Sequence, residues 1–295
     1  MINLGFWEKL KADSSRAGRG IMVLAHMADV TDCVFRQIIN KYGKPDVFWT
    51  EFVSADGLAH HVAREKLLID FKYSEAEHPI VAQIFGGKSE NIKIASALCK
   101  ELGFDGVDIN MGCPDKSVEK QCAGSGMIKD PNLAYEVIRA AKEGAEGLPI
   151  SVKTRIGYNK NEIETWIRGL LEQDIAVLTV HLRTRKEMSD VPAHWDMMKR
   201  IVEIRDELGK DTLIFGNGDA TDLKDGEQKV KDTGCDGIMF GRAIFGNPWL
   251  FSTSPNFSSA PLVDTDLSFG KTGTSSEVNL KEKLRDMVEH TKLFE

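Results

Sequence analysis

A single cysteine follows a stretch whose alternation of apolar and polar residues predicts a β-strand. The alternation covers residues 107–110 and leads directly into Gly112-Cys113-Pro114. Glycine permits a tight turn and proline fixes φ, so the sequence would hold Cys113 just beyond the strand end. A protonated thiol in such a place could act as a general acid. An isolated cysteine is more often a small buried apolar residue, so both interpretations stay open on these residues alone.

Polar side chains also stand near the ends of four successive predicted strands. They are Gln83, Asn110, Lys153, Arg155, His181 and Arg183. The pairs Lys153/Arg155 and His181/Arg183 are each two residues apart, so each pair shares one face of its strand. Buried cations are rare unless they are paired, and internal ion pairs would explain any one of them. Four neighbouring strands that direct polar groups to one place favour a ligand site.

Two glycine-containing turns suggest a phosphate site. They are residues 215–219, FGNGD, and residues 239–242, MFGR, and each follows a predicted strand. Glycines let the backbone N–H groups approach a phosphate closely, and Arg242 could add a charged contact. The alternative is that these glycines only make tight turns.

The elements that must position these residues alternate regularly along the chain. The predicted strands are 21–25, 46–52, 79–85, 106–112, 149–156, 177–183, 212–218 and 237–242, with amphipathic helical stretches such as 89–103 and 195–209. Several strands are almost entirely apolar, which is typical of parallel strands covered on both faces. Eight strand–helix repeats predict a (β/α)8 TIM barrel, with its chemistry at the strand ends. A doubly wound sheet is the alternative, weakened because no Gly-x-Gly-x-x-Gly follows the first strand.

Helix ends and the C-terminal part of the chain are also predictable. Ser89 and Asp130 resemble helix N-caps, and Gly103 and Gly209 resemble helix stops. The barrel is expected over residues 1–251. Residues 252–278 are rich in Ser, Thr, Pro and Gly and predict a loop or linker, and residues 279–295 predict a helix.

Composition limits the classes of function. The chain has 295 residues, and 38 basic against 45 acidic residues give a net charge of −7, which does not favour wholesale nucleic-acid binding. Five cysteines without a Cys-x-x-Cys pair weaken zinc and thioredoxin-like interpretations, so no metal site is expected. The odd cysteine count, together with no signal peptide and no long apolar run, predicts a cytoplasmic protein without a membrane span.

Taken in order, six segments resemble the tRNA-dihydrouridine synthases. They are MADVTDCVFRQI, DINMGCPDKSVEKQCAGSGMI, VKTRIG, VHLRTR, GNGD and FGRAIFGNPWLF, which together lie between about residues 20 and 251. The Asn-x-Gly-Cys-Pro element at residues 110–114 is the most specific of them. The resemblance implies an FMN-dependent TIM barrel that reduces uridine in tRNA with NADPH, and we expect it to be a monomer.

The resemblance also implies roles for individual residues. The active-site cysteine of the family falls on Cys113, which we therefore expect to protonate uracil C5 as hydride reaches C6 from the flavin. The implied flavin contacts are Met27, Gln83, Lys153, His181, Asn217, Gly218, Asp219, Gly241 and Arg242. Lys153 is suited to stabilise negative charge on the reduced ring, and Gln83 to hydrogen-bond its edge. Predicted substrate contacts are Asn110, Arg155, Arg183 and Arg185, the last two lying in the segment RTRK.

The chain departs from the family pattern at four places, one of which is Val191-Pro192-Ala193 in place of a more typical small-residue loop. His26 stands where proline is usual, in a loop expected to touch the flavin. It could add a contact or a functional role, but a tolerated substitution is the expectation, and Leu182 stands where glycine is usual. Family members carry a C-terminal helical domain that helps to hold tRNA, of which only the start, residues 279–295, is visible. Three alternatives remain open: an FMN barrel that acts on a free pyrimidine or an enone, a Schiff-base aldolase that uses Lys153, and a non-catalytic RNA-binding barrel.

Overall fold

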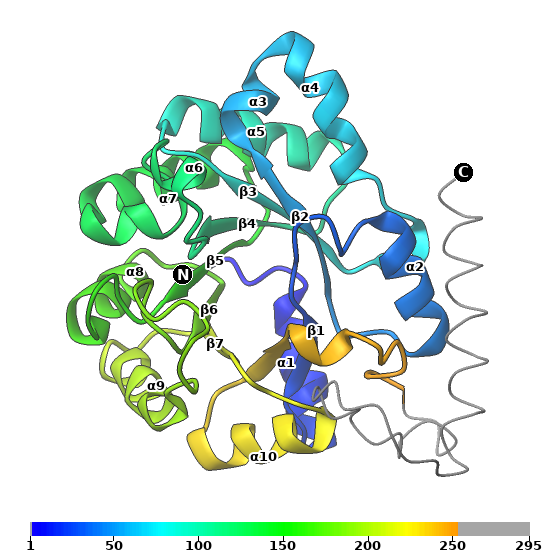
Figure 1. The fold of residues 1–295 in the computed structure, drawn as a ribbon, viewed down its shortest axis with the longest axis vertical. Coiled ribbons are helices and arrows are strands. Elements are labelled where there is room, and N and C mark those ends of the chain that lie inside the picture. Colours follow the sequence, from blue (N-terminus) through cyan, green and yellow to red (C-terminus); the bar gives the residue numbers. More distant parts are fainter. Residues whose placement is uncertain (1, 253–295) are drawn as a thin grey trace.

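Eight short strands form one parallel sheet in the computed structural model, which describes residues 2–252 (Figure 1). The strands are β1 (Ile21–Leu24), β2 (Phe48–Ser54), β3 (Ile80–Phe85), β4 (Gly106–Met111), β5 (Ile150–Arg155), β6 (Val177–His181), β7 (Leu213–Asn217) and β8 (Gly237–Phe240). Their hydrogen-bonded order is β1-β8-β7-β6-β5-β4-β3-β2. All eight predicted strands are present, with ends displaced by one or two residues.

The sheet closes between β1 and β2, which stand at the two ends of the hydrogen-bonded order. The Asp46 N–H, just before β2, donates to the Met22 carbonyl oxygen of β1 at 2.9 Å, and Met22 N–H donates to Asp46 Oδ2 at 2.7 Å. Each β-strand is followed by helical segments on the outside of the sheet, as Figure 1 shows. The predicted (β/α)8 barrel is confirmed. The doubly wound alternative is wrong, because the strand order runs once around a circle without a reversal.

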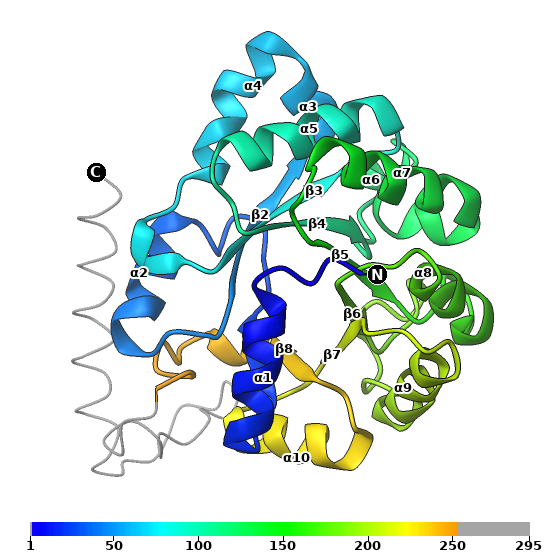
Figure 2. The same cartoon turned by 180° about the vertical axis from the view of Figure 1, so that it is seen from behind.

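Helices surround the sheet and cover one of its ends. They are α1 (Trp7–Ala17), α2 (Cys33–Tyr42), α3 (Ala55–Ala59), α4 (His61–Leu67), α5 (Ser89–Glu101), α6 (Lys116–Glu119), α7 (Pro131–Gly144), α8 (Arg168–Leu171), α9 (Met198–Glu207) and α10 (Leu223–Thr233). Figure 2 shows α1 from behind, across the end of the barrel at which the strands begin. Trp7 of α1 is buried there, with its ring 5.9 Å from Trp49 and 5.6 Å from Phe215. The opposite end, where the strands finish, is left for the site.

Alternation along a strand sends one set of side chains outward to the helices and the other set inward, where residues such as Ile21, Val23 and Phe215 form an apolar cluster with Trp7. In β4, Val107, Ile109 and Met111 belong to the large apolar cluster shared with the helices. The intervening residues Asp108 and Asn110 are buried as well, but they are polar and hydrogen-bond inside the barrel. The period-two pattern therefore decides which side chains can reach the site.

The predicted helix ends were mostly right. Asp130 caps α7 by accepting a hydrogen bond from Leu133 N–H at 3.2 Å, and Gly103 and Gly209 follow α5 and α9 with φ of 83° and 60°. The prediction for Ser89 is wrong by one residue. Ser89 is the first residue of α5, and its hydroxyl donates to Glu136 instead. The predicted linker and C-terminal helix, apart from residue 252, lie outside the described residues.

Within residues 2–252, no helix is both long and apolar enough to span a membrane. The same part of the chain contains no group of three or more His, Cys, Asp or Glu side chains arranged to bind a metal ion.

Candidate active site

A pocket of about 310 Å³ opens where the strands end, and it collects almost all of the predicted site residues. The predicted residues that line it are Met27, Asn110, Cys113, Lys153, Arg155, His181, Arg183, Asn217, Gly218, Asp219, Gly241 and Arg242. Two predicted residues, Gln83 and Arg185, do not line it. Predicted residues from six strands or from the loops after them thus meet at one mouth, as expected for a barrel of this kind.

The peptide of Cys113 is fixed from three directions. Asn110 Oδ1 accepts hydrogen bonds from Gly112 N–H at 3.1 Å and Cys113 N–H at 2.9 Å. Arg155 Nε donates to the Gly112 carbonyl oxygen at 2.9 Å, and the Ser125 N–H and hydroxyl each donate to the Cys113 carbonyl oxygen at 2.9 Å. Burial raises the pKa of the half-buried Cys113 thiol, so the thiol keeps its proton at neutral pH.

Arg185 lies behind this loop instead of in the pocket. Its guanidinium binds both carboxylate oxygens of Glu119 at 2.9 Å, donates to the Pro114 carbonyl oxygen at 3.2 Å and lies 5.5 Å from the centre of the Tyr158 ring. The residue therefore joins the loop after β6 to the loop that carries Cys113. Its predicted contact with tRNA stays a prediction.

Gln83 lies beneath the pocket and is fully buried. Its Oε1 accepts from Asn110 Nδ2 at 2.9 Å, and its Nε2 donates to Asp108 Oδ2 at 2.6 Å and to His26 Nδ1 at 2.8 Å. The other Asp108 oxygen accepts from the Ser151 hydroxyl at 2.5 Å. Burial raises the pKa of Asp108 to about 6. The amide of Gln83 is thus occupied by protein groups.

Lys153 supplies positive charge to the pocket wall. Burial lowers the pKa of its ammonium to about 8, helped by the charge of Arg155, whereas Asp108 and Cys113 favour the charged form. Arg155, two residues on, donates to the carbonyl oxygens of Thr184 at 3.1 Å and Met188 at 2.9 Å as well as to Gly112. Lys153 is therefore a cation at neutral pH, and its pKa is not far above neutral pH.

His181 presents a neutral imidazole with one unused nitrogen. Burial, and then the charges of Arg155 and Lys153, lower the pKa of His181 well below its ordinary value. Its Nε2 lies 3.3 Å from Arg183 Nη1, which can only donate, so Nε2 accepts and the proton resides on Nδ1. Nδ1 is buried and has no hydrogen-bond partner among the described residues. A buried donor without a partner marks a place for a ligand acceptor.

The turns after β7 and β8 meet at Asp219. Arg183 donates to Asp219 Oδ2 at 2.5 Å and Arg242 to Oδ1 at 2.9 Å, and hydrogen bonds from Arg183 and Ala193 keep the Asp219 pKa below its ordinary value despite burial. The side chain of Arg242 is 64% exposed. A Cβ added to Gly241 would meet no atom within 4 Å, so the backbone there is open to a ligand. The predicted phosphate turns therefore face one another.

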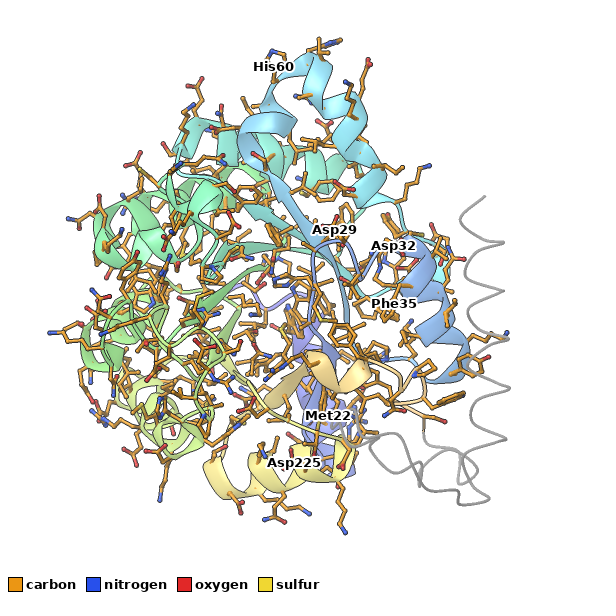
Figure 3. The ribbon with its side chains drawn as sticks, in the orientation of Figure 1. Met22, Asp29, Asp32, Phe35, His60 and Asp225 are labelled. Atoms are coloured by element: carbon orange, nitrogen blue, oxygen red, sulfur yellow. The ribbon has the colours of Figure 1, made fainter. Side chains whose placement is uncertain are left out.

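The loop after β1 completes the mouth. Met27 N–H donates to the Thr31 hydroxyl at 2.9 Å, and Asp32 caps α2 by accepting from Phe35 N–H at 2.7 Å (Figure 3). His26 at the start of this loop is 9% exposed and lines the pocket. Asp108 was assigned no role from the sequence, and His26 was expected to be a tolerated substitution. The sequence did contain a signal that Asp108 faces the barrel interior, because Asp108 stands two residues before Asn110 and therefore shares its face of the strand. Leu182 is fully buried in the outer apolar cluster.

Fold and site define a parallel (β/α)8 barrel whose mouth combines a cysteine with a cationic wall. The family model described as dihydrouridine synthase (Dus) matches residues 23–291, and the chain belongs to that family.

Two relatives and two solved structures extend the comparison. A probable tRNA-dihydrouridine synthase 2 of Bacillus subtilis (strain 168) is 46% identical over 261 residues, 88% of this chain and 78% of that protein. A probable tRNA-dihydrouridine synthase of Staphylococcus aureus (strain Mu50 / ATCC 700699) is 44% identical over 251 residues, 85% and 74% of the two chains.

Morphinone reductase in complex with tetrahydroNAD has a TM-score of 0.52 at 14% identity, covering 84% of this chain and 95% of that one. TcOYE with pHBA has a TM-score of 0.55 at 10% identity, covering 81% and 92%. At these identities the two structures show the fold alone.

Proposed function

We propose that this chain reduces uridine to 5,6-dihydrouridine in tRNA, with FMN bound in the barrel mouth and NADPH as the reductant. The observation that carries the proposal is the fixed peptide of Cys113, which places a protonated thiol at the edge of a pocket that also contains Lys153. The relatives at 44–46% identity carry names that include tRNA-dihydrouridine synthase, which supports the choice of tRNA as the substrate.

The residues present fit FMN. The unpartnered Nδ1 of His181 offers a buried donor, the open backbone at Gly241 allows close approach, and the exposed Arg242 offers a charge for a phosphate. Lys153, His181, the turn at 217–219 and Gly241-Arg242 would hold the cofactor. The predicted contact of Gln83 with the ring edge stays a prediction, and in the structure the Gln83 amide binds Asn110, Asp108 and His26.

When bound, FMN would supply the hydride that uracil C6 receives. The chain's own groups account for the rest of the reaction. Cys113 donates its proton to C5, and its raised pKa ensures that the proton is available at neutral pH. Lys153 places positive charge where the reduced cofactor accumulates negative charge. A base can enter the mouth only after it leaves its stack, so the uridine must be unstacked.

The substrate contacts stay part of the proposal. In the structure, Asn110, Arg155 and Arg185 each bond the backbone of residues 112–114, and Arg183 bonds the Val191 carbonyl oxygen at 2.5 Å as well as Asp219. We therefore expect these side chains to contribute to tRNA reduction mainly by placing the loops. A monomer and a cytoplasmic location also stay predictions.

The proposal is tested with the purified full chain. Its absorption spectrum should contain a flavin band, and incubation with NADPH and an unmodified tRNA transcript should add two hydrogens to a uridine, measured by mass spectrometry of the digested RNA. Equal activity on free uridine or on a simple enone would contradict the tRNA assignment. A colourless protein that borohydride inactivates in the presence of a sugar phosphate would indicate a Schiff-base lysine instead.

A further inference from the structure

A π-helical turn follows the loop after β5 and carries a buried tryptophan. The turn, η4 (Ile163–Ile167), continues directly into α8. π-helical turns are rare, and they occur frequently at functional sites. Trp166 within this turn is 2% exposed, and its indole Nε1–H donates to the hydroxyl oxygen of Thr154 at 2.9 Å. The helical segment after β5 therefore binds a side chain of β5 itself.

The Thr154 hydroxyl continues this contact to β4. Thr154 stands between Lys153 and Arg155, so its side chain faces away from the pocket that those two residues line. The indole N–H can only donate, so the hydroxyl oxygen accepts from it, and the hydroxyl hydrogen is directed to the Met111 carbonyl oxygen, 3.1 Å away. Thr154 and Met111 are both fully buried. The direction of each hydrogen bond from Trp166 to Met111 is therefore fixed.

The carbonyl that Thr154 binds lies where β4 ends and the turn that carries Cys113 begins. Each carbonyl oxygen from residue 111 to residue 114 accepts a hydrogen bond from a side chain. The donors, in the order of the acceptors, are Thr154 at 3.1 Å, Arg155 at 2.9 Å, the Ser125 hydroxyl at 2.9 Å and Arg185 at 3.2 Å. A Cβ added to Gly112 would lie only 3.3 Å from the Thr154 backbone, so the turn rests directly on this residue.

We propose that Thr154 and Trp166 are positioning residues that set the place of Cys113 for the proton transfer to uridine. The inference rests on the proposed function, because it needs Cys113 to act on the base. Neither side chain is among those that line the pocket, so both would act only through the turn. A proton donor must be held within about 0.5 Å of its productive place. Loss of the hydrogen bond to Met111 should therefore slow this step and leave flavin reduction by NADPH intact.

Valine and serine at position 154 test the role of the hydroxyl. Thr154→Val keeps the shape of the side chain and removes the hydroxyl, whereas Thr154→Ser keeps the hydroxyl. Thr154→Val should slow reoxidation of the reduced flavin by tRNA about tenfold, and Thr154→Ser should stay within about threefold of the wild type. Reduction by NADPH should change less than about twofold in both variants. Stopped-flow absorbance of the flavin measures the two steps separately.

Thr212→Val is the matched control. Thr212 is fully buried just before β7, at the end of the barrel where the strands begin, and its hydroxyl donates to the Ile175 carbonyl oxygen at 2.7 Å. Thr212→Val thus removes an equivalent hydrogen bond far from the turn. It should lower the melting temperature by about as much as Thr154→Val does and leave reoxidation unchanged. Equal slowing of reoxidation in the two variants would overturn the inference.

A double-mutant cycle with Cys113 separates positioning from general damage. If Thr154 acts through Cys113, adding Thr154→Val to Cys113→Ala should change reoxidation less than about twofold, because the positioned acid is already absent. A tenfold effect that persists in the Cys113→Ala background overturns the inference. Trp166→Phe keeps an aromatic ring and loses the donor. It should slow reoxidation about threefold alone and should not slow Thr154→Val further.

The outcomes separate the inference from the function it rests on. Wild-type reoxidation in a folded Thr154→Val variant, or a matching loss of the rate of reduction by NADPH, overturns the inference while the proposed function stands. Wild-type reoxidation in Cys113→Ala overturns the inference together with the acid role of Cys113 and leaves uridine reduction itself in place. A wild-type chain that does not reduce uridine in tRNA overturns both. If Thr154→Val does not fold, Trp166→Phe decides, and a wild-type reoxidation rate in that variant overturns the inference.

Discussion

Arg155 Nε donates a hydrogen bond to the Gly112 carbonyl oxygen at 2.9 Å, so strand β5 fixes the peptide that precedes Cys113. Lys153 lies two residues earlier on the same strand and the same face. The group proposed to donate the proton and the group proposed to face the cofactor are therefore positioned by one rigid element. A shift of β5 would move both, and catalytic groups on a shared strand keep their separation better than groups on loops.

Replacing Cys113 should separate the two halves of the reaction. Flavin reduction by NADPH needs no proton for uracil C5, so Cys113→Ala should bind FMN and be reduced at close to the wild-type rate. Reoxidation by tRNA should slow by about 10²–10⁴-fold, the usual contribution of a general acid. Cys113→Ser should recover little, because a hydroxyl is a much weaker acid than a thiol. Stopped-flow absorbance measures both steps, and reoxidation of Cys113→Ala at the wild-type rate would show that Cys113 is not the acid.

Much of the fold was predictable because one physical rule repeats along the chain. Parallel strands covered on both faces are apolar, and Lys153 or His181 at the end of such a strand is conspicuous. The repeat fixed the number of strands, and the glycines at 218 and 241 indicated the turns that face one another. Ser89 was misassigned because a serine at the first residue of a helix and one at the N-cap look alike in sequence.

The remaining features depend on contacts that no local pattern encodes. The flavin contact expected of Gln83, on β3, stays a prediction, whereas its hydrogen bonds to Asp108 and His26, which are distant in the chain, could not be read from the sequence. Arg185 was expected at the rim, but Glu119 binds it behind the Cys113 loop. Sequence indicates that such groups are polar and inward-facing. Which partner each one takes is decided by the closed barrel.

Removing the Lys153 ammonium should impair the cofactor site. Lys153→Ala is expected to retain less FMN after purification and to be reduced more slowly by NADPH, because the cation proposed to stabilise the reduced ring is lost. Flavin content by absorbance and reduction rate by stopped flow are the measurements. Full flavin occupancy together with a normal reduction rate would assign Lys153 a structural role only.

Burial of the Lys153 ammonium should lower the free energy of unfolding of the flavin-free protein, by an amount that depends on pH. Its pKa is about 8 in the folded chain against an ordinary 10.5, so the unfolded chain binds more protons between these values and folding becomes more favourable as pH rises through this window. Lys153→Met lacks this penalty. It should be more stable than the wild type by roughly 1–3 kcal/mol below pH 8, and the difference should vanish towards pH 10.5. Urea unfolding at several pH values measures it, and a difference that is independent of pH would contradict the assignment.

Replacing Arg242 should show whether this residue binds the phosphate of FMN or its ring. Its side chain is largely exposed and shares Asp219 with Arg183, so a phosphate could take its free donors. Arg242→Ala should weaken FMN binding about tenfold and leave the binding of riboflavin, which has no phosphate, within about twofold. Fluorescence titration with the two flavins gives the comparison. Equal losses for both ligands would place the phosphate elsewhere.

Arg185 permits two roles with opposite consequences, and a pair of variants decides between them. If Arg185 acts by holding the Cys113 loop through Glu119 and Pro114, then Arg185→Met and Glu119→Gln should both slow flavin reoxidation by tRNA, by about tenfold, since each breaks the same charged pair. Reduction by NADPH and the salt dependence of tRNA binding should stay unchanged in both.

If Arg185 instead contacts a tRNA phosphate, Arg185→Met should lower the slope of log affinity against log salt by about one. Glu119→Gln would then leave the arginine free and should not weaken binding. The measurements are single-turnover reoxidation and tRNA binding at several salt concentrations. We expect the first pattern, because in the structure the guanidinium already binds a carboxylate and a backbone carbonyl behind the loop.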